Sequence, residues 1–249
     1  MEMLSLSNII SIGLTLFLVY ALYVTLRILF YTRKAVLAGK QTRPASNVNP
    51  RASHRVLVIG DSTSYGTGAI NMGDSLVGRL IRDYPDYEIL NKSENGIGIK
   101  RVHEIISHIE ETFDFVIIHI GGIDTLAFSR KKTIIEYMKK INEQAKRLHA
   151  RTLILVSMNN AGSLPLMLFP LDIIFNLRSR LLSRLFAKIC SENNIVHVPL
   201  FTNRKDEPLL QNGENHFSPD LIHPNDFGYG IWYEKVKRVF DTEISKMNS

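Results

Sequence analysis

The sequence has only one cysteine and one tryptophan in 249 residues. It therefore lacks the paired cysteines of a disulfide-stabilised secreted domain, and lone Cys190 is expected to be a buried apolar side chain. Internal repeats and low-complexity tracts are not evident either. With 45% hydrophobic residues, the length suits one domain of ordinary size plus an appendage.

Charge is missing from the beginning of the chain. No charged residue lies between Met3 and Leu26, and the apolar core at 9–24, with its flanks, is long enough to cross a ~30 Å hydrocarbon layer as a helix. A cleaved signal peptide is the competing interpretation. However, the basic n-region is missing, the apolar run exceeds the usual ~7–15 residues, and no clear A-x-A site follows. We therefore predict that residues 1–32 form an uncleaved transmembrane anchor.

The formal charge of +6 would suit a nucleic-acid partner, but its distribution does not. Residues 1–51 carry six basic side chains and one acidic one, whereas the remainder is nearly neutral, with 24 basic and 23 acidic. We therefore expect no nucleic-acid partner. Only Glu2 precedes the apolar span, and five basic residues lie at its end or soon after it: Arg27, Arg33, Lys34, Lys40 and Arg43. The positive-inside rule then predicts that the rest of the chain is cytoplasmic.

Residues 33–53 contain glycine, proline, asparagine and serine together with basic side chains, and we predict a flexible, basic polar linker that can lie against anionic headgroups. From residue 54 the pattern alternates between short apolar runs and helical periodicity. This alternation predicts one three-layer α/β/α domain over 54–249 with a five-stranded parallel sheet. The expected strands are 55–59, 87–91, 115–120, 152–157 and 195–198, and the expected helices lie near 74–83, 100–111, 131–148, 171–190 and 225–245.

Two short motifs carry the candidate chemistry. Gly60-Asp61-Ser62 follows the first apolar strand, and Asp220-Leu221-Ile222-His223-Pro224 precedes the last helix. Each alone is also an ordinary capped turn. A parallel sheet, however, brings both to its carboxyl edge. Together they supply a serine nucleophile (Ser62), an imidazole that takes its proton (His223) and a carboxylate that orients the imidazole (Asp220).

These residues resemble the SGNH or GDSL-type serine hydrolases. Residues 58–66 are similar to the nucleophile block of that family, Leu90-Asn91 with Asn95-Gly96 to its second block, and residues 220–224 to its last block. The resemblance covers roughly residues 54–240 and implies a flavodoxin-like sheet with the site at its carboxyl edge. It also implies that Ser62 is the nucleophile and that the backbone N–H groups of Ser62 and Gly96 form the oxyanion hole.

The third block departs from the family pattern Gly-x-Asn-Asp. Here it is Gly121-Gly122-Ile123-Asp124, so Ile123 occupies the position of the asparagine that would donate to the oxyanion. Losing one such donor typically costs about 10²- to 10³-fold in rate. Three outcomes follow: a slower hydrolase with two donors, an active one in which Asn95, Asn159 or Asn160 substitutes, or a domain that has lost catalysis. Because Ser62, Asp220 and His223 are all present, we expect the protein to be an active enzyme.

These observations lead to the hypothesis of a membrane-anchored serine esterase acting on carboxylic esters, such as lipid or lysophospholipid esters. The chemistry needs neither a metal nor an organic cofactor. The expected partners are a small-molecule or lipid ester and the membrane. The alternatives are an acyl or acetyl transferase with the same acyl-enzyme, and a catalytically degenerate membrane-bound binding protein. Many members of the family are secreted, which keeps a periplasmic or extracellular domain as the alternative to a cytoplasmic one.

The apolar segment 162–171 contains two prolines, which favour a loop. Such a loop could line an acyl pocket, dip toward the membrane beside the anchor, or simply pack between the fourth strand and the following helix.

Overall fold

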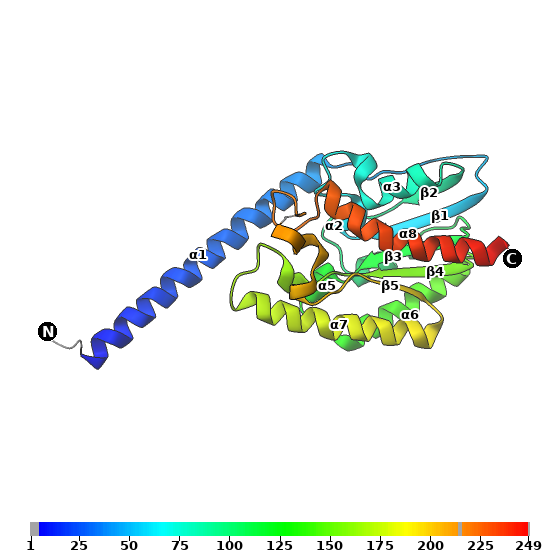
Figure 1. The fold of residues 1–249 in the computed structure, drawn as a ribbon. Helices are drawn as coiled ribbons and strands as arrows, with labels where there is room; N and C mark the ends of the chain where they lie inside the picture. The colour runs from blue at the N-terminus through cyan, green and yellow to red at the C-terminus, as the bar shows by residue number, and fades with distance from the viewer. Residues whose placement is uncertain (1–4, 214–215, 249) are drawn as a thin grey trace.

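The computed structural model describes residues 5–213 and 216–248, and it shows one long helix followed by an α/β domain (Figure 1). The five predicted strands are all present in a single sheet of parallel strands in the order β2-β1-β3-β4-β5. Their bounds are β1 His54–Gly60, β2 Tyr87–Asn91, β3 Phe115–Ile120, β4 Thr152–Ser157 and β5 Val196–Pro199. The predicted fold class is therefore confirmed.

Helices cover both faces of the sheet and connect its strands. The described residues form the helices α1 Leu6–Gln41, α2 Ser62–Tyr65, α3 Leu76–Asp83, α4 Ile99–Ser107, α5 Gly122–Leu126, α6 Lys131–Arg147, α7 Leu171–Asn193 and α8 Asp226–Asn248. Short 3₁₀ turns lie at Met72–Asp74, Ala161–Ser163, Arg204–Asp206 and Pro208–Gly213.

The alternation of side chains along β1 explains the three layers. Leu57 and Ile59 point into a core formed with α4, α6 and α7, whereas Val56 and Val58 point into a second core formed with α3 and α8. An almost continuously apolar strand is what a sheet buried on both faces requires. In the register, Gly60 pairs with His119, so β1 and β3 end at the same edge of the sheet. The loops that carry both motifs begin at this edge or pack against it.

Helix α1 is longer than the sequence predicted. It continues to Gln41, so the predicted linker at 33–53 is wrong for its first nine residues. The segment 33–38 contains no proline or glycine and consists largely of good helix formers, which allows the apolar helix to propagate through it. The helix ends before Pro44, which disfavours helical backbone at the residue before it.

The rest of the predicted linker, residues 42–53, contacts strand β2 through Asn47. The backbone of Asn47 forms an antiparallel bridge with Ile89 through two hydrogen bonds of 2.9 Å, and its side-chain amide donates to the carbonyl of Tyr87. Because β2 is an edge strand, its unpaired backbone groups are available to a passing segment. The expectation of a flexible tether is corrected here.

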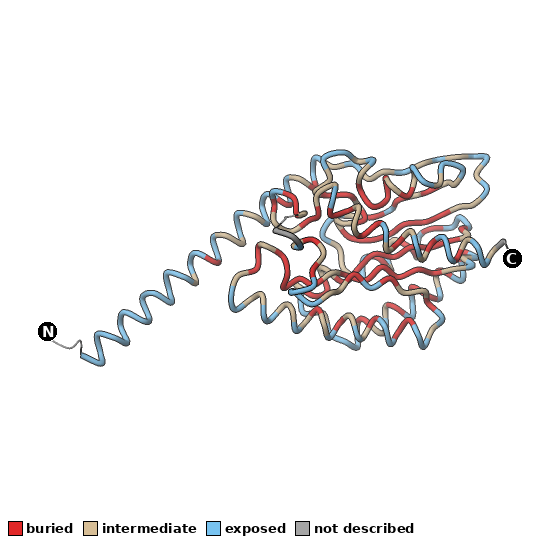
Figure 2. The backbone as a smooth tube through the Cα atoms, in the orientation of Figure 1, coloured by how far each residue is buried: buried red, intermediate tan, exposed pale blue. Residues whose placement is uncertain are grey.

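Most residues of α1 are exposed, as Figure 2 shows, and only Val24, Ala35 and Gly39 of this helix are buried. The helix is long and apolar enough to cross a membrane, a test of length and composition that a signal sequence also passes. The exposed apolar side chains have no protein core to cover them. They therefore need another apolar environment.

Candidate active site

Ser62 is positioned by the turn between β1 and α2. Asp61 caps the helix, because its carboxylate accepts a hydrogen bond from the Thr63 N–H at 3.0 Å. Gly60 leaves room for this turn, since a Cβ there would lie only 2.4 Å from the carbonyl oxygen of His119. Ser62 is therefore held at the carboxyl edge of the sheet as the first residue of α2.

The turn before α8 brings two more predicted residues to Ser62. His223 Nε2 lies 2.8 Å from Ser62 Oγ, across 161 positions of sequence. On the other side of the imidazole, His223 Nδ1 lies 2.7 Å from Asp220 Oδ2. All three predicted triad side chains are thus joined in one line of hydrogen bonds. With Nδ1 protonated toward the carboxylate, Nε2 is left to accept the serine proton.

Asp220 is buried, yet its surroundings favour the charged form. Burial by itself would raise its pKa, but hydrogen bonds and the charge interaction with His223, together with the Ser218 hydroxyl, lower the pKa to about 2. Its Oδ1 accepts from Ser218 Oγ at 2.7 Å and from the N–H groups of Ile222 and His223 at 2.9 Å each. A carboxylate with this many donors stays ionised at neutral pH and can stabilise an imidazolium.

Gly68 supports the other side of His223. Its φ of +97° is in the region that favours glycine, and a Cβ there would lie 2.6 Å from His223 Cβ and 2.5 Å from the carbonyl oxygen of Pro224. The loop after α2 therefore packs directly against the turn that carries His223. Only glycine permits so close an approach.

The two residues expected on the oxyanion side also lie together. Gly96 and Ile123 line one hollow of about 300 Å³, and Gly96 adopts a positive φ of +73°. The buried Asp124 joins the first residue of α4 to the segment after α5. Its Oδ2 accepts from the Ile99 N–H at 3.0 Å, and its Oδ1 accepts from Ser129 Oγ at 2.8 Å. Ile123, at the position where the family pattern has an asparagine, thus lines the same hollow as Gly96.

The three amides considered as substitutes differ in their hydrogen bonds. The Asn95 amide donates to the carbonyl of Gly39 at 3.1 Å and accepts from Thr67 Oγ1 at 2.7 Å. The Asn160 amide donates to Asn176 Oδ1 at 2.7 Å and to the carbonyl of Thr202. In contrast, the buried Nδ2 of Asn159 has no hydrogen-bond partner among residues 5–213 and 216–248.

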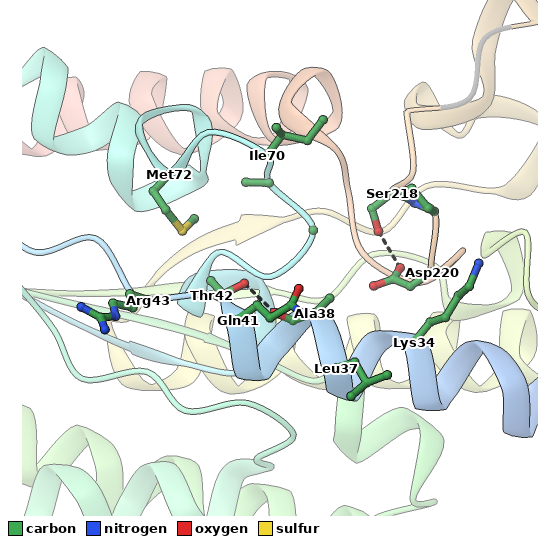
Figure 3. Close-up of a pocket in the computed structure, with 13 residues that line it drawn as sticks. Lys34, Leu37, Ala38, Gln41, Thr42, Arg43, Ile70, Met72, Ser218 and Asp220 are labelled. Carbon is green, nitrogen blue, oxygen red and sulfur yellow. Dashed lines mark hydrogen bonds between the residues drawn. The ribbon is translucent and has the colours of Figure 1, made fainter.

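Helix α1 makes a contribution to the site that was not predicted from the sequence. The end of α1 and the residues after it form one wall of a cleft of about 670 Å³ (Figure 3). Facing this wall are Ile70 and Met72 and the segment from Ser218 to Asp220, so the cleft reaches the buried carboxylate of the triad. The small residues Ala35, Ala38 and Gly39, at helical spacing, are the signal that could have predicted a packed face here.

The segment 162–171 is divided between core and surface. Leu164, Leu166 and Met167 are buried, whereas Phe169 is 63% exposed. The first part is therefore a packing connection. Its outer tip, in contrast, is exposed.

A family model and several solved structures match this chain. The model of the GDSL-like lipase/acylhydrolase family matches residues 58–231, a range that includes both motifs. No curated protein matches the chain. Solved structures do, and at their low identities the likeness shows the fold. TesA is 20% identical, with 74% of this chain and 97% of that chain covered and a TM-score of 0.58. A lipolytic G-D-S-L family protein from Veillonella parvula is 19% identical, with 75% of this chain and 98% of that chain covered and a TM-score of 0.59. The psychrotrophic esterase EstA from Pseudoalteromonas sp. is 16% identical, with 78% of this chain and 100% of that chain covered and a TM-score of 0.54.

Proposed function

Because this chain belongs to the GDSL-like lipase/acylhydrolase family and is an ester-hydrolysing serine hydrolase, we propose that Ser62, His223 and Asp220 are its catalytic triad. The observation that carries this proposal is the line of hydrogen bonds of 2.8 and 2.7 Å through the imidazole. In this mechanism Ser62 Oγ attacks the acyl carbon while His223 Nε2 takes its proton. The alcohol then leaves with that proton, and water attacks the acyl-enzyme in the same way.

The tetrahedral intermediate needs donors for its oxyanion. The backbone N–H groups of Ser62 and Gly96 fill two of these positions. We propose Asn159 Nδ2 as the third donor in place of the side chain missing at Ile123, because it is a buried amide nitrogen without a partner in the described residues. A buried donor without a partner costs about 1–3 kcal/mol, and a developing oxyanion would supply that partner. Asn160 Nδ2 already donates two hydrogen bonds, and Asn95 Nδ2 donates one to the carbonyl of Gly39.

The proposed substrate is an ester that resides at a membrane surface, such as a lipid or lysophospholipid ester. Helix α1 is the proposed single-pass anchor for the domain at 54–249, which keeps the site near lipid. The wall of the cleft combines apolar side chains, such as Leu37, with the basic Lys34 and Arg43. This combination suits an amphiphile with an anionic group. No metal or organic cofactor is part of this mechanism.

Covalent labelling of the full-length protein in membranes with a fluorophosphonate tests the triad. We expect labelling of the wild type and its loss in Ser62→Ala and His223→Ala. Ser64→Ala is the matched control, since Ser64 lies on the same short helix but is buried. Retained labelling in Ser62→Ala would contradict the assignment. Absent labelling of folded wild type would favour the degenerate binding protein, and product formation only with an acceptor alcohol would favour the transferase.

A further inference from the structure

Six large apolar side chains are exposed next to the loop at 162–171. Each of these side chains is between 41% and 63% exposed, and the six are Phe128, Phe169 and, on α7, Ile173, Ile174, Leu177 and Leu181. We refer to these six residues as the apolar patch. We propose that this patch lies in the interfacial region of the lipid bilayer, so that the hydrolase domain docks on the membrane as well as being tethered to it. This inference rests on the proposed role of α1 as a membrane-spanning anchor.

The pattern along α7 is that of a helix lying at an interface. Its exposed positions recur every three or four residues, which places them on one stripe of the helix. The first part of the stripe is apolar and consists of Ile173, Ile174, Leu177 and Leu181. Its later part is basic, with the exposed side chains of Arg184 and Lys188. An apolar stripe that becomes basic suits acyl chains at one end and anionic headgroups at the other.

Helix α1 locates the patch relative to the membrane. The Tyr20 hydroxyl donates to the carbonyl of Phe169 at 2.8 Å, and Arg27 Nη2 donates to the carbonyl of Pro165 at 3.0 Å. Tyr20 lies inside the charge-free span, seven residues before Arg27, which corresponds to about 10 Å of helix rise. A membrane-spanning α1 therefore carries Phe169 to the depth of its own apolar segment.

These contacts favour lipid over a protein partner for the patch. The loop runs alongside α1, and α7 begins where the loop ends (Figure 1). The patch is thus joined to a surface that already requires an apolar environment. A protein partner covering it would have to enter the membrane beside α1.

Docking also brings the site toward its substrate. The Leu166 N–H donates to the carbonyl of Leu221 at 3.3 Å. In the sequence, Leu221 lies between Asp220 and His223, two residues of the proposed triad. The loop that carries Phe169 is therefore packed against the turn that carries the base.

Fluorescence quenching by spin-labelled lipids tests the proposal in vesicles that contain the full-length chain. An environment-sensitive dye is attached to Phe169→Cys or Leu177→Cys in a Cys190→Ala background. Lys146→Cys on α6 is the control exposed to water, and Leu16→Cys is the control inside the span. We expect the dyes at 169 and 177 to lose most of their fluorescence, as at 16, while the dye at 146 keeps its fluorescence.

Each other outcome overturns the proposal. Unquenched dyes at 169 and 177 with a quenched dye at 16 would mean that the chain is anchored but the patch does not touch lipid. Dye–dye interaction between copies at 177 without lipid quenching would assign the patch to a second copy. An unquenched dye at 16 would overturn the membrane-spanning α1 and this inference with it.

An activity assay separates docking from chemistry. Leu177→Glu changes an exposed side chain, so we expect normal folding. We also expect unchanged hydrolysis of a water-soluble short-chain ester but reduced hydrolysis of an ester embedded in vesicles, with Lys146→Glu unaffected on both. Equal vesicle activity in Leu177→Glu and wild type would contradict docking. Absence of short-chain activity in the wild type would count against the proposed triad instead.

Discussion

At the scale of single residues, Asp220 shows how the fold sets an ionisation state. Its carboxylate is removed from water, which disfavours the charge, yet three donors on Oδ1 and the imidazole on Oδ2 reverse the effect. The pKa of about 2 in the folded protein is below the ~3.9 of an unfolded chain. Folding therefore favours ionised Asp220.

This difference predicts a dependence of stability on pH. A lowered pKa contributes stability that is fully present above the unfolded value of ~3.9 and is lost as the pH falls through the folded value. For Asp220 this contribution is about 2–3 kcal/mol. We expect the difference in unfolding free energy between wild type and Asp220→Asn to shrink as the pH falls from 5 to 2. Denaturant unfolding in detergent at several pH values measures it. Asp86→Asn, at an exposed position, is the control, and a pH-independent difference would contradict the prediction.

Asn159 provides a second prediction at this scale. If its unpartnered Nδ2 donates to the oxyanion, Asn159→Ala and Asn159→Asp should each lower kcat by about 10²- to 10³-fold with a smaller effect on KM. Asn159→Asp is the sharper variant, because it keeps the shape and removes the donor. Steady-state hydrolysis of a short-chain ester measures the effect. Unchanged kcat in both variants would leave a two-donor hole made of backbone N–H groups.

At the scale of elements, the loop after α2 holds the turn before α8 in place. Gly68→Ala introduces a methyl group against His223 and Pro224, while Gly96→Ala meets no atom within 4 Å. Both substitutions carry the strain of a positive φ, about 1–2 kcal/mol. We therefore expect Gly68→Ala to lower the melting temperature more than Gly96→Ala. Equal decreases would show that the loop moves away freely and that Gly68 does not support His223.

The end of α1 is also an element with two roles. Its outer side chains lack protein cover, whereas Gly39 accepts a hydrogen bond from Asn95 and the neighbouring turn lines the cleft. Anchoring and the shape of the cleft are therefore coupled through one helix. A freely flexible linker could not provide this coupling.

At the scale of the whole molecule, the distribution of charge predicts topology. We expect the intact chain of 28.3 kDa to remain in membranes after an alkaline wash, with the hydrolase domain on the cytoplasmic side. Protease protection in sealed vesicles of known orientation, read by mass spectrometry, measures this. A shortened, soluble product would identify a cleaved signal sequence, and digestion from the opposite face would place the domain outside the cytoplasm.

Much of the domain could be predicted because its signals are local. The apolar runs at β1 and β3 and the periodicity of α6 define their elements without reference to distant residues, and the structure agrees with the prediction to within a few residues. The two motifs could be paired because a parallel sheet places the carboxyl ends of its strands at one edge. The length of α1 was misjudged, since the change from apolar to basic composition does not end a helix.

The sequence by itself determined the order of the elements, the fold class and the residue types available for chemistry, because periodicity and turn residues act over a few positions. Tertiary structure alone decided which amide is left without a partner, where Gly39 meets Asn95 and how Tyr20 reaches Phe169. These contacts join residues far apart in the chain. Their formation depends on the packing of several elements at once, which no local pattern encodes.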